Sequence, residues 1–365
     1  MKETIAVGLV LPFGYLDDSI KGISHFAEHL LFNSNSVKYF LKTFDEKGIL
    51  YNGITSYDYI LFYCQGLKSD RQLMVDFCES ILLNFEITEE EFEREKKIVL
   101  SEIEYYLQNK IEVVSNNLVG NKNSLAILGS RESISSITRL NIVEYIDNIK
   151  KIYSIVDSDG VVMTTKNRCK EQIIFSESKK NTIKLINNND YTFNNYYGIG
   201  IRVSREVSKY FRVFIDKFLY NLNNEFREKK ALTYRIHTCV VKTTEFVQHQ
   251  FIFSIVNEGT YLDIIKSTED ILERTKKEVL NLCKEKRERY LERLETKTAI
   301  RLDNQLGRMK FHALENLYMQ SNKENDILLE DDIDNLSLII AVYNTNEIDI
   351  TLEYKEFDVE IIHYG

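Results

Sequence analysis

Long apolar runs, paired cysteines and an excess of basic residues are all missing from this sequence. No stretch of 18 apolar residues occurs, which excludes a membrane-spanning helix of ordinary length. Lysine and arginine number 47 against 56 acidic residues, and the net charge of −9 argues against a general nucleic-acid-binding protein. The apolar run from Ile5 to Phe13 is too short for a cleaved signal. None of the five cysteines forms a C-x-x-C pair, so we expect reduced core thiols and a cytoplasmic protein; they are Cys64, Cys78, Cys169, Cys239 and Cys283.

The most informative stretch is His25-Phe26-Ala27-Glu28-His29, which reads H-x-x-E-H, the inverted form of a zinc-hydrolase motif. On a helix, His25 and His29 are separated by four residues, so both rings project from one face and can bind one Zn²⁺. Glu28 lies beside that face, where its carboxylate can take a proton from a metal-bound water whose pKa zinc lowers to about 7. The alternative is that the pentapeptide occurs by chance. A candidate third ligand farther along the chain would argue against chance.

A catalytic zinc needs a third protein ligand from another rigid element. The segment from Thr88 to Lys110 is rich in helix formers, and Thr88 followed by Glu91 forms a capping box. Glu95 and Glu102 are seven residues apart and therefore share a face of this predicted helix. A buried carboxylate needs a partner, which a metal provides, although an acidic helix that simply faces solvent is the ordinary alternative.

The segment Gly22–Phe32 resembles the signature of the pitrilysin/insulinase-type zinc peptidases, a family that includes the mitochondrial processing peptidases and small bacterial relatives. The resemblance implies one zinc per chain, bound by His25, His29 and Glu102, with Glu28 as the catalytic base. It also implies that Glu95, the main rival for the third position, supports the site without binding the metal.

Weaker similarities follow in chain order. Asn52-Gly53-Ile54-Thr55 resembles the family's Asn-Ala-x-Thr strand, which makes Asn52 and Thr55 candidate substrate-binding residues. The segment 127–134 resembles a leucine-glycine-threonine-x-glutamate motif. The segment Arg227–Tyr234 resembles a second-domain motif that places Arg227 and Tyr234 at the catalytic chamber, with roles in catalysis and substrate binding. Ala231 stands where the family prefers glycine. The family also carries a strand before the one expected from Thr4, so a trimmed N-terminus is expected.

The length of 365 residues, with 44% hydrophobic and 28% charged residues, fits two globular domains of ordinary size. Mixed helix and strand patterns predict an α+β fold, including a strand over 4–11 and a motif helix over 19–33 with Ser19 as N-cap. We expect a zinc-binding catalytic domain over 1–170, a polar linker over 171–189, and a zinc-free domain over 190–365. The resemblance implies that the two domains are related, each a mainly antiparallel sheet with helices on one face, and together form a clam-like half of a peptide chamber.

Three functions are compatible with these residues. The first is a zinc endopeptidase that cleaves short or unfolded peptides, with maturation of a ribosomally made peptide as a specialised role. The second is a catalytically silent structural or regulatory subunit of a related peptidase heterodimer. The third, a zinc amidase acting on small molecules, is disfavoured by the second-domain similarity. The resemblance further implies a homodimer or a heterodimer with a related chain.

Overall fold

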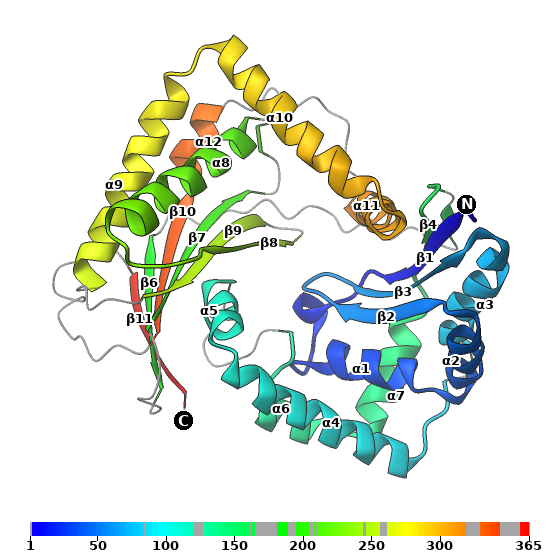
Figure 1. Ribbon diagram of the computed structural model, residues 1–365. Coiled ribbons are helices and arrows are strands. Elements are labelled where there is room, and N and C mark those ends of the chain that lie inside the picture. Colours follow the sequence, from blue (N-terminus) through cyan, green and yellow to red (C-terminus); the bar gives the residue numbers. More distant parts are fainter. Residues whose placement is uncertain are drawn as a thin grey trace. The chain divides into compact units, whose positions relative to one another are not determined.

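The chain divides into two compact units, each with its own sheet (Figure 1). The first unit comprises Met1–Tyr105, Ser124–Glu171 and Thr298–Asn322, and the second comprises Tyr106–Asn123, Gln172–Lys297 and Lys323–Gly365. The structure is a computed structural model, and it describes residues 2–83, 85–119, 127–160, 162–164, 181–188, 195–204, 207–208, 210–243, 246–255, 261–318, 329–343 and 358–364. None of the described helices combines the length and apolar character that a membrane crossing needs.

The first unit is built on a five-stranded antiparallel sheet in the order β2-β3-β1-β4-β5. The predicted strand over 4–11 is confirmed as β1, and seven of its eight side chains are buried. Such complete burial occurs because both faces of the sheet are covered. The strands are β1 (Thr4–Leu11), β2 (Leu50–Thr55), β3 (Ile60–Leu67), β4 (Ser154–Asp157) and β5 (Val162–Thr164).

Helices cover the two faces of this sheet unequally. One face carries α1 and α3 among other helices, and the opposite face carries α11, whose Met309 and Ala313 pack on Ala6 and Val10 of β1. The expected helical layer on one face is therefore joined by a helix on the other. The helical elements are η1 (Tyr15–Asp17), α1 (Ile23–Phe32), α2 (Asn35–Lys47), η2 (Lys68–Asp70), α3 (Arg71–Leu82), α4 (Glu89–Gln108), α6 (Arg131–Ser136), α7 (Arg139–Ile149) and α11 (Gln305–Tyr318).

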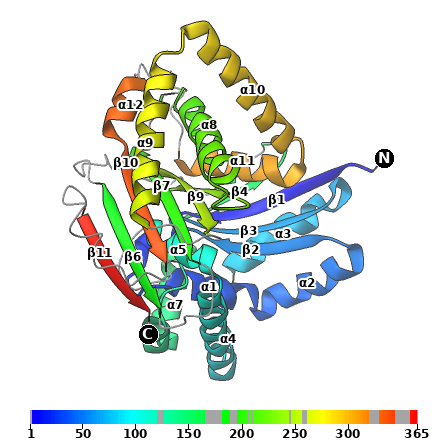
Figure 2. The ribbon, with the colours of Figure 1, turned by 60° about the vertical axis from the view of Figure 1, so that its left-hand side comes forward.

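The second unit contains a six-stranded sheet in the order β11-β6-β10-β7-β9-β8, in which β6 runs parallel to β10 and to β11 (Figure 2). The remaining pairings are antiparallel. Together the two sheets confirm the α+β class. The strands are β6 (Thr182–Asn188), β7 (Tyr196–Ser204), β8 (His237–Lys242), β9 (Phe246–Ser254), β10 (Ser337–Tyr343) and β11 (Asp358–Tyr364).

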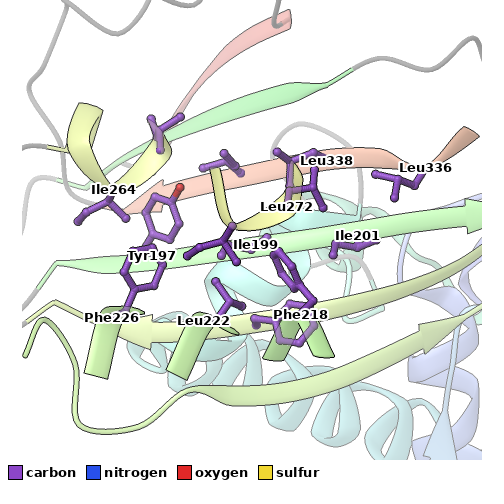
Figure 3. Close-up of a cluster of buried hydrophobic side chains, with 14 of the residues drawn as sticks. Tyr197, Ile199, Ile201, Phe218, Leu222, Phe226, Ile264, Leu272, Leu336 and Leu338 are labelled. Atoms are coloured by element: carbon purple, nitrogen blue, oxygen red, sulfur yellow. The ribbon is translucent and has the colours of Figure 1, made fainter. Parts of the chain in front are cut away.

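The core of the second unit lies between this sheet and α8 and α9 (Figure 3). Tyr197 and Ile199 of β7 pack there with Phe218 and Leu222 of α8, because alternate residues of a strand face the same side. The opposite face is covered by α5. The helical elements are α5 (Lys110–Val119), α8 (Phe211–Leu222), a π-helical segment η3 (Asn223–Lys229), α9 (Tyr261–Leu280), α10 (Lys284–Leu302) and α12 (Leu329–Asn335).

Each unit therefore receives one helix from the other half of the chain: α5 in the second unit and α11 in the first. Glycines give both helices room. A Cβ on Gly8 would lie 2.5 Å from the Met309 sulfur, and a Cβ on Gly198 would collide with Val114 of α5. The predicted linker over 171–189 is wrong over 182–188, which form β6 because Ile183 and Ile186 are buried in the second unit. Residues 171–180 and 189 lie outside the described residues. The division into domains 1–170 and 190–365, and their clam-like arrangement, stay predictions.

Candidate metal centre

The motif helix α1 is fixed at its N-terminus by a buried carboxylate. Asp18 accepts hydrogen bonds from the backbone N–H groups of Gly22 (2.9 Å) and Ser24 (3.2 Å), which a helix start otherwise leaves unpaired. Burial raises the pKa of Asp18 to about 7, although these hydrogen bonds act in the opposite direction. The helix begins at Ile23, so the predicted N-cap at Ser19 is wrong: Gly22, with φ of 87°, reverses the chain immediately before the helix.

The segment before α6 holds the same helix terminus from the other side. A Cβ on Gly22 would lie 2.5 Å from the Leu128 carbonyl oxygen, and a Cβ on Gly129 would lie 2.5 Å from that of Lys21. At each glycine, a carbonyl of the other segment lies where a Cβ would stand, so glycine permits this close approach of the two segments. This contact gives the leucine-glycine segment at 127–134 a local structural role in positioning the motif helix.

Three donor atoms converge between α1 and α4. The Nε2 atoms of His25 and His29 lie 3.7 Å and 3.2 Å from Oε2 of Glu102, and one ligand atom from each residue lies within 4.8 Å of the others. Tetrahedral zinc with bonds near 2.1 Å separates its ligands by about 3.4 Å, so the spacing fits the ion. Among the described residues, no other group of histidine, cysteine and acidic side chains comes together in this way.

The protonation of the three groups also suits a cation. Burial, followed by the neighbouring His29, lowers the pKa of His25 to about 4, so this imidazole is neutral at pH 7 and has a free lone pair. The hydrogen bond from His29 lowers the pKa of Glu102 despite its partial burial. Burial lowers the pKa of His29, but Glu102, Glu28 and Glu95 outweigh that effect and raise it. The surplus of negative charge around His29 is the charge that a bound cation would balance.

Glu95 lies behind the cluster and is 3% exposed. Its Oε1 accepts two hydrogen bonds from Arg94, while its Oε2 accepts one from Asn33 (3.2 Å) and lies 3.9 Å from Nδ1 of His29. Asn33 also donates to the carbonyl of His29 (3.0 Å) and thereby ties Glu95 to the end of α1. Sequence reasoning missed Asn33, because its partner is 62 residues away in the chain.

Glu28 extends from α1 toward the edge strand β2. Its Oε2 accepts a hydrogen bond from Thr55 (3.3 Å), and a Cβ on Gly53 would collide with its Oε1. Burial raises the pKa of Glu28, while the charge of His29 and the Thr55 hydrogen bond act against that rise. Gly53 was not selected from the sequence; it replaces the alanine of the resembled strand motif and brings β2 close to the carboxylate.

The other predicted substrate residues lie elsewhere. Asn52 faces away from Glu28 and donates to the hydroxyl of Tyr63 (3.5 Å), because residues 52 and 55 of one strand point to opposite faces. Arg227 and Tyr234 belong to the second unit, where the guanidinium lies 5.7 Å from the ring centroid of Tyr234. Tyr234 is 82% exposed, so its hydroxyl is available to a ligand. The roles of these residues stay predictions.

Comparison with known proteins finds a family to which the N-terminal part of the chain is similar. Residues 1–130 match the family described as Insulinase (Peptidase family M16). An uncharacterized zinc protease of Rickettsia felis is 25% identical over 181 residues, 45% of this chain and 44% of that protein. The mitochondrial-processing peptidase subunit beta of Neurospora crassa is 30% identical over 156 residues, 40% of this chain and 33% of that subunit. The matched part thus spans less than half of either relative.

Solved structures resemble nearly the whole fold. A protease from Helicobacter pylori superposes with a TM-score of 0.74 at 14% identity, over 93% of this chain and 95% of that one. A peptidase M16 inactive domain from Pseudomonas fluorescens gives a TM-score of 0.65 at 12% identity, over 94% and 93%. At such identities the likeness concerns the fold alone, and the second protein is described as inactive.

Proposed function

We propose, from the similarity of residues 1–130 to the insulinase family of peptidases, that this chain is a zinc-dependent endopeptidase acting on short or unfolded peptides. The observation that carries the proposal is the convergence of His25, His29 and Glu102 at ligand spacing, with Glu28 beside them. These three residues would hold one Zn²⁺. When bound, the ion supplies a polarised water and a Lewis acid for the peptide carbonyl.

The residues around the ion divide the remaining work. Glu28 accepts a proton from the attacking water at its carboxylate and later delivers it to the leaving amine. Thr55 orients that carboxylate through its hydroxyl. Glu95, fixed by Arg94 and Asn33, lies 3.9 Å from Nδ1 of His29 and would hold that ring in the orientation that a metal ligand needs.

Substrate binding is assigned to a strand edge and to the second unit. β2 is the terminal strand of its sheet, so an extended peptide can pair with Asn52–Thr55 through backbone hydrogen bonds. Arg227 and Tyr234 would hold substrate carbonyl groups. We also propose that the chain works as a dimer, with itself or with a related chain, since the Neurospora crassa relative is named as a subunit. Its proposed location is the cytoplasm, which the dispersed thiols support.

A silent subunit of a related peptidase is the second candidate, because one structural neighbour is an inactive domain of the same fold. The complete set of His25, His29, Glu102 and Glu28 favours the active alternative. Maturation of a ribosomally made peptide remains the specialised role that we propose for the activity.

Zinc content and peptide hydrolysis of four variants test the proposal. His25→Ala and Glu102→Gln should lose zinc, whereas Glu28→Gln should keep zinc and lose nearly all hydrolysis of an unstructured peptide library. Glu93→Gln, an exposed position on the same helix as Glu102, is the matched control and should retain both. Undiminished zinc in His25→Ala or Glu102→Gln would sink the ligand assignment, and near-normal hydrolysis by Glu28→Gln would remove the assigned base.

A further inference from the structure

A polar row crosses the first sheet on the face opposite Glu28. Asn52 of β2 pairs with Tyr63 of β3, and Tyr63 pairs with Gly8 of β1. Directly paired residues project from the same face of a sheet, so these three positions lie side by side. The Asn52 amide donates to the Tyr63 hydroxyl oxygen, which leaves the hydroxyl proton free for another acceptor.

Helix α11 places a cation over this row. Met309 packs at Gly8, and the next residue, Lys310, extends its ammonium to 4.6 Å from the ring centroid of Tyr63. Lys310 is half-buried, and among the described residues it lies within ion-pair distance of no carboxylate. A half-buried cation without an acidic partner among the described residues is a favourable local position for an external anion, even in a chain with a net charge of −9.

The edge strand determines which substrate side chain would reach this cation. The outer side of β2 pairs with no described strand, and a peptide docking there would alternate its side chains between the two faces. The peptide residue opposite Gly53 would face Glu28. Its neighbour, opposite Asn52, would face Tyr63 and Lys310.

We infer that Asn52, Tyr63 and Lys310 form a subsite for an acidic substrate side chain, next to the residue that faces Glu28. The inference rests on the proposed peptidase function and gives it a substrate class. Strands lie about 4.8 Å apart, so a docked residue is one spacing from Asn52 and two from Tyr63. A glutamate spans this distance better than an aspartate, since its carboxylate is one methylene farther from the backbone. Its carboxylate would accept from the Lys310 ammonium, the Asn52 amide and the Tyr63 hydroxyl.

Binding measured without cleavage tests the subsite directly. Fluorescently labelled peptides that differ only in one residue, Glu, Asp, Gln or Lys, are titrated against the zinc-loaded Glu28→Gln protein. The variable residue is scanned along the peptide. At one position the Glu peptide should bind about fivefold more tightly than the Gln peptide, with Asp intermediate and Lys weakest. Adding Lys310→Met should abolish the difference, Lys310→Arg should preserve it, and Lys310→Glu should make the Lys peptide the tightest.

Two controls separate the subsite from general effects. Lys217→Met removes a comparable lysine, 5.0 Å from the Tyr220 ring centroid in the second unit, and should leave the Glu preference intact. Tyr63→Phe keeps the ring beneath Lys310 and should weaken the preference only partly. An unchanged Glu preference in Lys310→Met would overturn the inference. Equal weakening of all four peptides would also overturn it, because it would mean that Lys310 acts only on the fold.

The outcome is distinguishable from that of the proposed function. If the Glu preference depends on Lys310 but the protein with Glu28 intact hydrolyses no peptide, the subsite is retained and the peptidase function is rejected. Hydrolysis that depends on Glu28, without any position at which Glu and Gln peptides differ in affinity, would retain the peptidase and reject the subsite.

Discussion

The two units use similar architectures but place their buried polar groups differently. In the first unit, the buried His25 lies beside His29 and Glu102, and one ligand atom from each of these side chains lies within 4.8 Å of the others. In the second unit, Gln250 is fully buried and is hydrogen-bonded to both the hydroxyl and the carbonyl of Ser115 on α5. Buried polarity in the first unit thus remains available to a cation, whereas in the second it attaches a helix to a sheet.

Arg202 extends this attachment in the second unit. Its guanidinium donates to the carbonyl oxygens of Leu118 and Val119 at the end of α5 and to Oε1 of Gln248. A cation at a helix C-terminus stabilises carbonyls that have no partner within the helix. The comparison teaches that a common layered fold does not itself make a metal site. The site depends on which side chains occupy the buried polar positions.

The largest expected difference between the units is catalytic. Glu28→Gln should reduce peptide hydrolysis by about 10² to 10⁴ with zinc retained, because an amide cannot accept the proton. Arg227→Ala in the second unit should retain zinc and weaken cleavage by about tenfold to a hundredfold, since the proposed role of Arg227 is that of a charged hydrogen-bond donor to substrate. Initial rates with one unstructured peptide, alongside zinc analysis, measure both effects.

Mixing these two variants tests whether the units cooperate across a dimer. If the zinc site of one chain uses Arg227 of its partner, a mixture of Glu28→Gln and Arg227→Ala chains should regain activity. Each variant assayed alone, at the same total protein concentration, serves as the control. Failure to regain activity, after subunit exchange has been verified by mass spectrometry, would mean that the site is completed within one chain or by a different partner.

Metal removal should lower the stability of the first unit and leave that of the second unit nearly unchanged. Zinc at about a thousand times its dissociation constant stabilises the state that binds it by about 4 kcal/mol. Hydrogen exchange should therefore accelerate on chelation in α1 and α4, which carry the proposed ligands, and stay nearly constant in β7 and β9. Equal acceleration in both units, or none in α1, would contradict a metal site confined to the first unit. The His25→Ala protein should show no further change with chelator.

The zinc motif was predictable because its geometry is local. Residues four apart on a helix share a face, so the placement of His25 and His29 follows from spacing alone. Glu102 required a second helix and the family resemblance, and the confirmed capping box at Thr88 and Glu91 made that helix predictable. The opposite orientations of Asn52 and Thr55 also followed from strand alternation, although sequence reasoning grouped them together.

Other features depend on contacts between distant segments. Asp18 replaces the expected cap at Ser19 because folding brings its carboxylate under the start of α1. Asn33 and Gly53 acquire their positions only when α4 and β2 reach α1. The exchange of α5 and α11 has no local signal either, since an amphipathic helix does not specify which sheet it will cover.

A smaller effect concerns the two exchanged helices. Gly198→Ala should destabilise the fold by about 2–3 kcal/mol, because the new methyl group meets Val114, a β-branched side chain with little freedom. Gly8→Ala should cost about 1 kcal/mol, since Met309 can adopt another rotamer. Urea unfolding of both variants measures the difference. Adding Val114→Ala should recover part of the loss in Gly198→Ala but none in Gly8→Ala. The reverse order of costs would show that α11 is the more rigidly packed helix.

The smallest expected effect concerns backbone strain at Ala231, which lies between Arg227 and Tyr234 in the chain. Ala231 has a φ of 48°, just after the π-helical segment, where the resembled family prefers glycine. A left-handed conformation costs an L-residue about 1–2 kcal/mol, which glycine avoids at an entropic cost of about 0.5–1 kcal/mol. Ala231→Gly should therefore stabilise the protein by about 0.5–1 kcal/mol and leave zinc content and hydrolysis unchanged.

Ala299→Gly, an exposed site within α10, should destabilise it by about 1 kcal/mol. Thermal unfolding of the two variants measures both changes. Equal destabilisation would show that Ala231 is not strained, and reduced hydrolysis at full stability would show that alanine itself orients Arg227 and Tyr234.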